Sequence, residues 1–289
     1  MTAIPSSLRF GLQPSLLILV VTFWALNPEF EFTYLIAIVG VQLTLGLVEH
    51  RWPARESWVV NVRETMLNIL LVVILVMGSI AVAEFYLSVL AEPLEHWREA
   101  RNLDVWPHHW PLVLQMFIAF FASEFMGYWI HRAEHRWTII WRASGHGAHH
   151  SFKRLNALNF GLNHPLELFL LAIPLLIVEL VFGVGIAAAG AALLISTQAS
   201  FAHTNIELNS KGIGWLFTTS RYHIRHHSVV MEESNTNYGC GAIIWDRIFG
   251  TFEDGETAEA GTGPTEPSLW GKLLMPIKEP SDTAVAPKS

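Results

Sequence analysis

The chain carries three short histidine clusters within one third of its length. The first is His131-Arg-Ala-Glu-His135, and two more share the pattern His-x-x-His-His. Residues three and four apart share one face of a helix, so each cluster would aim its imidazoles in one direction. Neutral imidazole is the commonest metal ligand and suits iron, zinc and copper. The pattern predicts a metal site built from His131, His135, His146, His149, His150, His223, His226 and His227.

The number of imidazoles indicates two metal ions. A structural zinc takes about four protein ligands and a catalytic one about three, so eight exceed what one octahedral ion accepts if positions stay open for chemistry. His203 ends an apolar run shortly before the third cluster and is a further candidate ligand. His164 is a possible ligand only, because no histidine lies three or four residues from it.

Two carboxylates lie in register with these histidines. Glu124 continues the helical stripe of Tyr128, His131 and His135. A carboxylate is costly within a membrane, so Glu124 is expected either to hydrogen-bond a ligand imidazole or to form a polar packing contact away from the metals. Glu207 lies four residues after His203 and is a further ligand, a hydrogen-bond partner of one, or a solvated side chain.

Apolar segments must position these groups. With 52% hydrophobic residues and a mean hydropathy of +0.36, the chain is not an ordinary soluble domain. Apolar runs predict spans at 11–26, 33–48, 66–90 and 111–131, and residues 165–202 predict a helical hairpin that turns near Gly183 to Gly185. The first run lacks a cleavage site and is expected to stay as an anchor.

We therefore expect an all-α integral membrane bundle of about four spans plus a hairpin, with a histidine-rich helical cap that holds a dinuclear metal site. Residues 1–110 would form N-terminal transmembrane helices, 111–252 a catalytic domain and 253–289 a polar C-terminal tail. Residues 253–264 and 279–289 are rich in Glu, Gly, Thr, Pro, Ser and Ala, which is typical of loops and flexible tails.

Charge placement predicts the orientation in the membrane. With the N-terminus in the cytoplasm, every Lys and Arg except Arg98 and Arg101 lies on the inner side. The positive-inside rule favours this arrangement, which puts the histidine clusters on the cytoplasmic side of a bacterial inner membrane or an endoplasmic-reticulum-type membrane. It excludes His96, His108 and His109 as ligands, because they lie on the opposite side, and makes His50 interfacial.

Composition excludes several classes of function. The net charge of −7 and the lack of a basic stripe argue against a nucleic-acid partner. Cys240 is the chain's single cysteine, which rules out an internal disulfide, a thiolate zinc site and an iron–sulfur cluster.

The ordered motifs resemble the fatty acid hydroxylase and sterol desaturase superfamily over roughly residues 115–252. They are the three clusters, His203-Thr-Asn205, Asn237-Tyr238-Gly239 and Trp245-Asp246 through Thr251. The resemblance implies an integral-membrane di-iron oxygenase that uses O2 on a lipid, with His203 and the eight clustered histidines as iron ligands. Asn205, Tyr238 and Asp246 would support the ligands or the scaffold. Some members have histidine where this chain has Glu207, which leaves further ligands open.

Elementary chemistry agrees with this implication. Breaking an unactivated C–H bond needs a high-valent metal–oxygen species, which iron can form and zinc cannot. The leading hypothesis is hydroxylation of a sterol, fatty acyl or other lipid, and the alternative is a lipid desaturase with the same di-iron site. A metal transport or storage protein is a weaker hypothesis, and a zinc hydrolase is weaker still because the chain has no His-Glu-x-x-His.

The same motif survey indicates an external electron donor. No Gly-rich dinucleotide motif or haem-binding domain is evident, so a ferredoxin or a cytochrome with its reductase is expected to supply electrons. The lipid, the carbon attacked, the donor and the oligomeric state stay open at this point.

Overall fold

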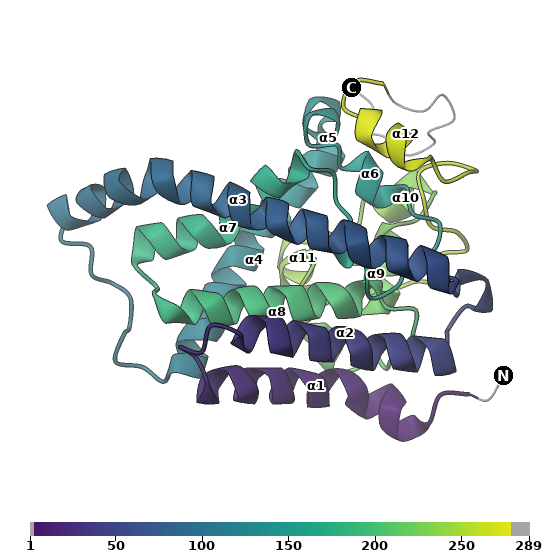
Figure 1. Cartoon of the computed structure of the whole chain (residues 1–289), viewed down its shortest axis with the longest axis horizontal. Helices are drawn as coiled ribbons and strands as arrows, with labels where there is room; N and C mark the ends of the chain where they lie inside the picture. Colours follow the sequence, from purple (N-terminus) through teal and green to yellow (C-terminus); the bar gives the residue numbers. More distant parts are fainter. Residues whose placement is uncertain (1–2, 279–289) are drawn as a thin grey trace.

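The computed structural model describes residues 3–278, and within them every regular element is a helix apart from an isolated bridge between Ser228 and Ala260. The predicted all-α class is confirmed. In this described part of the chain, five helices are long and apolar enough to cross a membrane: α1 (Ser6–Leu26), α2 (Thr33–Arg51), α3 (Val62–Ala100), α4 (Leu112–Arg136) and α8 (Ile186–His203). Figure 1 shows α1, α2, α8 and α3 running lengthwise, with α4 passing behind them at an angle.

The helices follow the predicted spans but extend beyond them. The span expected at 66–90 lies within α3, which begins where the Asn61 side chain accepts a hydrogen bond from the Glu64 N–H at 3.0 Å and the Glu64 carboxylate accepts one from the Asn61 N–H at 3.2 Å. Such a reciprocal cap satisfies N–H groups that otherwise lack partners at a helix start. The hairpin consists of α7 (Glu167–Phe182) and α8, joined through Gly183 and Gly185, both in the left-handed region with φ of 65° and 70°.

Helix α8 lies at the centre of the bundle and packs against α1, α2, α4 and α7. Its buried face carries small residues, among them Ala187, Gly190 and Ala191. A Cβ on Gly190 would lie 2.6 Å from the indole of Trp24, so only glycine lets α1 approach this closely. The core therefore fixes the position of the helix that ends at His203.

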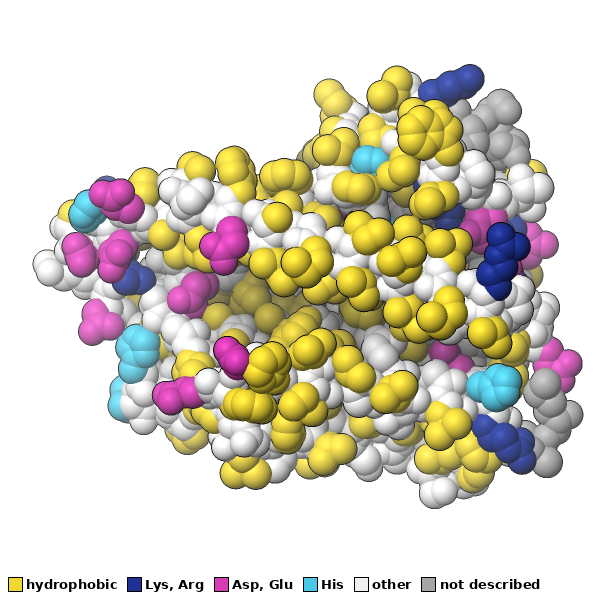
Figure 2. Space-filling model, in the orientation of Figure 1, with side chains coloured by type: hydrophobic (Ala, Val, Ile, Leu, Met, Phe, Trp, Pro, Cys, Tyr) yellow, Lys and Arg dark blue, Asp and Glu magenta, His cyan; other side chains and the backbone are white. Residues whose placement is uncertain are grey.

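The outer surface has the pattern of a membrane protein. Helix α3 buries only Val82 and leaves its other apolar side chains exposed or half-buried. In Figure 2 hydrophobic side chains cover the middle of the visible face, and charged side chains gather mainly toward its two ends. Long exposed apolar helices of this kind are stable where lipid is the solvent.

Short helices form a cap beside this bundle (Figure 1). They are α5 (Thr138–Ser144), α6 (Gly147–His150), α9 (Ser220–His226), α10 (Met231–Ser234), α11 (Ile244–Phe249) and α12 (Leu269–Leu274), with the 3-10 turns η1 (Glu56–Trp58), η2 (Asn159–Gly161) and η3 (Ile213–Trp215).

Residues 253–264 form an irregular segment, as expected, but this segment packs tightly on the cap. The Gly261 N–H donates to the His227 carbonyl at 2.9 Å and the Val229 N–H donates to the Glu259 carbonyl at 3.1 Å. The segment therefore holds the third histidine cluster in place. The predicted tail at 279–289 lies outside the described residues.

Candidate metal centre

Nine of the ten histidines singled out from the sequence converge into two compact groups, and every one of the nine is buried. The first, the five-histidine site, consists of His131, His135, His146, His150 and His226. The second, the four-histidine site, consists of His149, His203, His223 and His227. The two groups adjoin, since the rings of His150 and His227 stack with centroids 4.3 Å apart.

Each group draws on several elements. The last two turns of α4 carry His131 and His135, and α8 ends at His203. The two His-x-x-His-His clusters lie on the short helices α6 and α9 and on the residues next to them. Each of these clusters contributes to both groups: His146 and His150 belong to one site and His149 to the other. One helical turn thus spans both sites.

The five-histidine site contains a contact between two imidazoles that a bound cation would stabilise. The Nδ1 of His131 donates to the Tyr238 carbonyl at 2.6 Å, and the Nδ1 of His226 donates to the Thr236 carbonyl at 2.8 Å. Because a carbonyl only accepts, both Nδ1 atoms carry the proton, and in a neutral imidazole both Nε2 atoms are then bare acceptors. These two Nε2 atoms lie 3.0 Å apart. Two lone pairs at this distance repel unless a positive ion lies between them.

The other distances fit the same ion. The Nε2 of His146 lies 3.0 Å from that of His131 and 3.1 Å from that of His135, which lies 3.1 Å from the Nε2 of His150. Two nitrogens on one ion, with bonds of about 2.1 Å roughly at right angles, lie about 3.0 Å apart. The residues present therefore match a metal site in both donor type and spacing.

In the four-histidine site the Nε2 atoms have a similar spacing, but fewer rings are held by a hydrogen bond at Nδ1. The Nε2 of His203 lies 3.2 Å from the Nε2 atoms of His149 and His223, and the Nε2 of His227 lies 3.2 Å from that of His223. His203 donates from Nδ1 to the Ala199 carbonyl at 2.9 Å. The Nδ1 atoms of His223 and His227 are buried without a hydrogen-bond partner among residues 3–278.

Burial keeps these imidazoles neutral. It lowers the pKa of His146, His149, His150, His223, His226 and His227 well below the ordinary imidazole value. A neutral imidazole offers a lone pair to a metal, whereas a protonated one offers none. The cap therefore presents its histidines in the form that binds metal.

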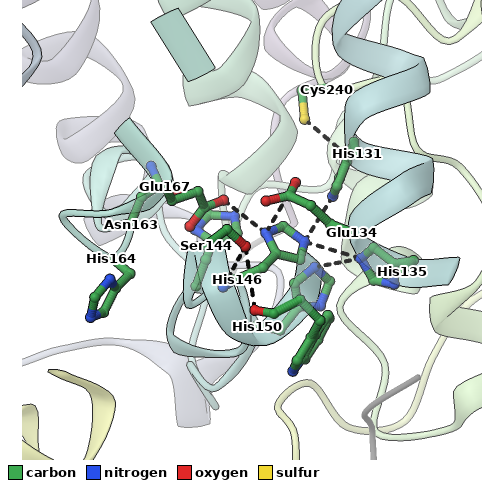
Figure 3. A network of polar contacts seen from close by, with 12 residues as sticks. His131, Glu134, His135, Ser144, His146, His150, Asn163, His164, Glu167 and Cys240 are labelled. Carbon is green, nitrogen blue, oxygen red and sulfur yellow. Dashed lines mark hydrogen bonds and ion pairs between the residues drawn. The ribbon is translucent and has the colours of Figure 1, made fainter. Parts of the chain in front are cut away.

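Two carboxylates that the sequence reasoning missed contact the five-histidine site. Glu167 Oε1 accepts a hydrogen bond from the Nδ1 of His146 at 2.7 Å, and Glu134 Oε2 lies 3.7 Å from the same nitrogen. Figure 3 shows both carboxylates directed at His146. Residue spacing within one helix could not indicate the role of Glu167, because its contact with His146 joins the start of α7 to the turn between α5 and α6. Its place in the first turn of a helix beside the cap was the only available signal.

Three sequence candidates lie elsewhere. Glu124 accepts hydrogen bonds from the N–H groups of Gly241 and Ala242 at 2.7 and 3.0 Å, so its carboxylate supports a loop instead of an imidazole. Glu207 is exposed and pairs with Arg9 at 2.5 Å. His164 belongs to neither group.

His164 supports the C-terminal helix. Its Nε2 donates to the Leu273 carbonyl at 3.2 Å, while its Nδ1 accepts from the Leu166 N–H at 3.1 Å. In Figure 3 its ring lies away from His146 and the rest of the cluster. Gly145, with φ of 75°, packs so closely against the ring that a Cβ there would lie 2.4 Å from it.

Asp246 supports the five-histidine site indirectly, through Tyr238. The Asp246 carboxylate accepts from the N–H groups of Tyr238 and Gly239, both at 2.7 Å, and from the Thr251 hydroxyl at 2.7 Å. These bonds hold the loop whose Tyr238 carbonyl orients His131. Asp246 thus acts on the ring through one intervening residue.

Asn205 and Glu49 anchor the end of α8. The Asn205 side chain accepts from the Arg55 N–H at 2.9 Å and donates to the Arg55 carbonyl at 3.0 Å. Glu49, which the sequence reasoning also missed, accepts from the Asn205 N–H at 2.7 Å, the Thr204 hydroxyl at 2.8 Å and the Ala157 N–H at 2.9 Å. Together they tie α2 to the residues that follow His203.

Comparison with known proteins agrees with this geometry. The fatty acid hydroxylase family profile matches residues 116–251. The ornithine lipid hydroxylase OlsE of Rhizobium tropici is 30% identical over 228 residues, which are 73% of this chain and 64% of that protein. Human alkylglycerol monooxygenase is 29% identical over 178 residues (59% and 37%), and mouse lathosterol oxidase is 27% identical over 165 residues (56% and 53%).

The chain spans less than two thirds of each of these relatives. No solved structure matches it. The matched segment nevertheless holds all nine converging histidines and the loop that orients His131. Residues 116–251 therefore form a fatty acid hydroxylase domain, similar in sequence to segments of ornithine lipid hydroxylase, alkylglycerol monooxygenase and lathosterol oxidase.

Proposed function

We propose that the chain is a membrane-bound, O2-dependent oxygenase that uses two iron ions to hydroxylate a C–H bond of a lipid. The observation that carries the proposal is the pair of adjoining buried histidine sites, one of which places two bare Nε2 atoms 3.0 Å apart. The five-histidine site would hold one iron and the four-histidine site the other. The family membership supports iron over redox-inert zinc, because relatives are named as a hydroxylase, a monooxygenase and an oxidase.

When bound, iron supplies the electrons and the oxidising power needed to cleave O2 and attack an unactivated C–H bond. The protein's own residues do the remaining work. Tyr238, Thr236 and Glu167 each fix one imidazole with its lone pair toward the site. Burial of all nine histidines excludes bulk water, which protects a strong oxidant from unproductive reactions.

A lipid substrate suits the surroundings of the site. The helices that lead to it, α4 and α8, belong to an apolar bundle whose outer surface is exposed to lipid. An acyl chain or sterol would reach the metals from the bilayer without crossing water. The relatives' names, ornithine lipid hydroxylase and alkylglycerol monooxygenase, support a membrane lipid as substrate and hydroxylation over desaturation.

The charge distribution supports a cytoplasmic position for the histidine cap, since Arg98 and Arg101 would be the only basic residues on the other side. Electrons would then arrive from a soluble or membrane-bound donor, such as a ferredoxin or a cytochrome with its reductase. A metal transporter would instead need ligands along a path through the bilayer, whereas these nine histidines form two compact groups.

The test is lipid mass spectrometry of cells that express the full chain or its His226→Ala variant. The proposal expects a lipid that gains one oxygen atom with the wild type and does not change with the variant. A loss of two hydrogen atoms would indicate a desaturase. Identical lipidomes in both cells, with the protein present and loaded with iron, would contradict the proposed activity.

A further inference from the structure

We propose that Glu167 is a positioning residue that acts through His146 and makes the five-histidine site the tighter of the two metal sites. The inference rests on the proposed dinuclear function and adds that the two sites differ in metal affinity. Its basis is the buried contact between Glu167 and His146 and the lack of a counterpart in the four-histidine site.

The contact fixes the metal-binding form of His146. Glu167 Oε1 lies 2.7 Å from Nδ1, and both side chains are at most 3% exposed. A carboxylate at this distance holds the proton on Nδ1, which leaves the Nε2 lone pair for the metal and makes the imidazole a stronger ligand. Glu167 is itself held at the first residue of α7, where its N–H donates to the His164 carbonyl at 2.9 Å.

Charge favours a cation at the same place. Glu134 and Glu167 both approach His146, and their other oxygens, Oε1 of Glu134 and Oε2 of Glu167, are buried without a hydrogen-bond partner among the described residues. A buried carboxylate stays ionised only beside a compensating positive charge and otherwise takes up a proton. A metal ion bound to Nε2 of His146 supplies this charge through the ring.

The four-histidine site lacks this support. No carboxylate from residues 3–278 belongs to it. Of its rings, His203 donates to a backbone carbonyl, while the Nδ1 atoms of His223 and His227 have no acceptor within residues 3–278. In the five-histidine site His131, His146 and His226 all donate from Nδ1. Outer hydrogen bonds of this kind commonly contribute 10–100-fold, as an order of magnitude, to metal affinity.

The experiment isolates the five-histidine site. His223→Ala in the full, detergent-purified chain breaks the four-histidine site, and Co²⁺ binding to the remaining site is measured by visible absorption against a competing chelator. Adding Glu167→Gln is expected to weaken Co²⁺ binding by roughly 10–100-fold. Glu179→Gln, a matched change at the far end of the same helix, is expected to leave the affinity within about twofold. Unchanged affinity in the Glu167→Gln variant would overturn the proposal.

A second measurement distinguishes a failure of this inference from a failure of the proposed function. In wild type, graded chelator is expected to remove one ion well before the other, whereas in Glu167→Gln the two ions should leave together. If both ions leave the wild type at the same chelator concentration, the proposed difference in metal affinity is contradicted. Fewer than two ions in untreated wild type would refute the dinuclear function instead. Three ions per chain would place a cation between Glu134 and Glu167 and overturn the positioning role.

Discussion

The Nε2 atoms of His131 and His226 lie 3.0 Å apart, and neither ring has a proton to offer at that position. Both rings have committed their proton at Nδ1 to a backbone carbonyl, of Tyr238 and Thr236 respectively. A cation between the rings would remove the repulsion between the two lone pairs. The contact joins residues 95 positions apart in the sequence, at the end of α4 and in α9, so a metal ion bound here would couple metal binding to folding of the cap.

Replacing His226 by Ala tests this coupling. The variant is expected to lose one of two bound irons and to lower hydroxylation by at least about 100-fold, because one site loses a ligand. Iron analysis and product mass spectrometry measure the two effects. The control is His50→Ala, an exposed histidine at the end of α2. Full iron content in the His226 variant would refute its role as a ligand.

Metal removal should destabilise the cap. An ion present at about 100 times its dissociation constant stabilises the folded state by about 2.7 kcal/mol, because it binds the folded form only. Chelation is therefore expected to lower the melting temperature and to expose the 253–263 segment to protease. Melting curves that coincide with and without chelator would speak against a resident ion.

Replacing Asp246 by Asn should weaken the loop that orients His131. The side chain would then face the N–H groups of Tyr238 and Gly239 with one acceptor fewer, and leaving a buried N–H unpaired costs about 1–3 kcal/mol. Thermal unfolding of the purified protein measures the loss. Asp254→Asn, at an exposed ion pair with Arg221, should change stability by less than about 1 kcal/mol. Equal effects of the two substitutions would contradict the assigned role.

The His164→Ala variant tests whether His164 supports the scaffold or binds a metal. The variant is expected to keep both irons, since His164 belongs to neither histidine group, and to free α12 from the cap because the bond to the Leu273 carbonyl is lost. Iron analysis combined with limited proteolysis in the α12 region reports both properties. Loss of an iron from this variant would return His164 to the list of ligands.

Much of this arrangement could be predicted from the sequence because it depends on patterns within single segments of the chain. The spans follow from apolar runs, and the nine histidines follow from helical spacing and from the position of His203 at the end of one run. Spacing within one helix cannot show which other segment a side chain will face. For that reason the spacing left open whether Glu124 bonds an imidazole or makes a polar contact away from the metals, and its carboxylate accepts hydrogen bonds from the N–H groups of Gly241 and Ala242.

The same limit explains why the sequence did not indicate the buried contacts of two carboxylates. Glu167 reaches His146 across 21 residues, and Glu49 reaches Asn205 across 156. Both are single acidic residues at helix ends, where a solvated carboxylate is the ordinary outcome. Only the tertiary structure, which brings the start of α7 to the α5–α6 turn and the end of α2 to the end of α8, places them beside buried donors.

The central claim is tested most directly by counting and characterising iron in the purified full chain, grown with ⁵⁷Fe, by elemental analysis and Mössbauer spectroscopy. The account predicts two irons per chain in two distinct environments, because one site has five histidines and the other four. A single iron per chain, or two ions bound at exposed positions and unaffected by His226→Ala, would contradict it.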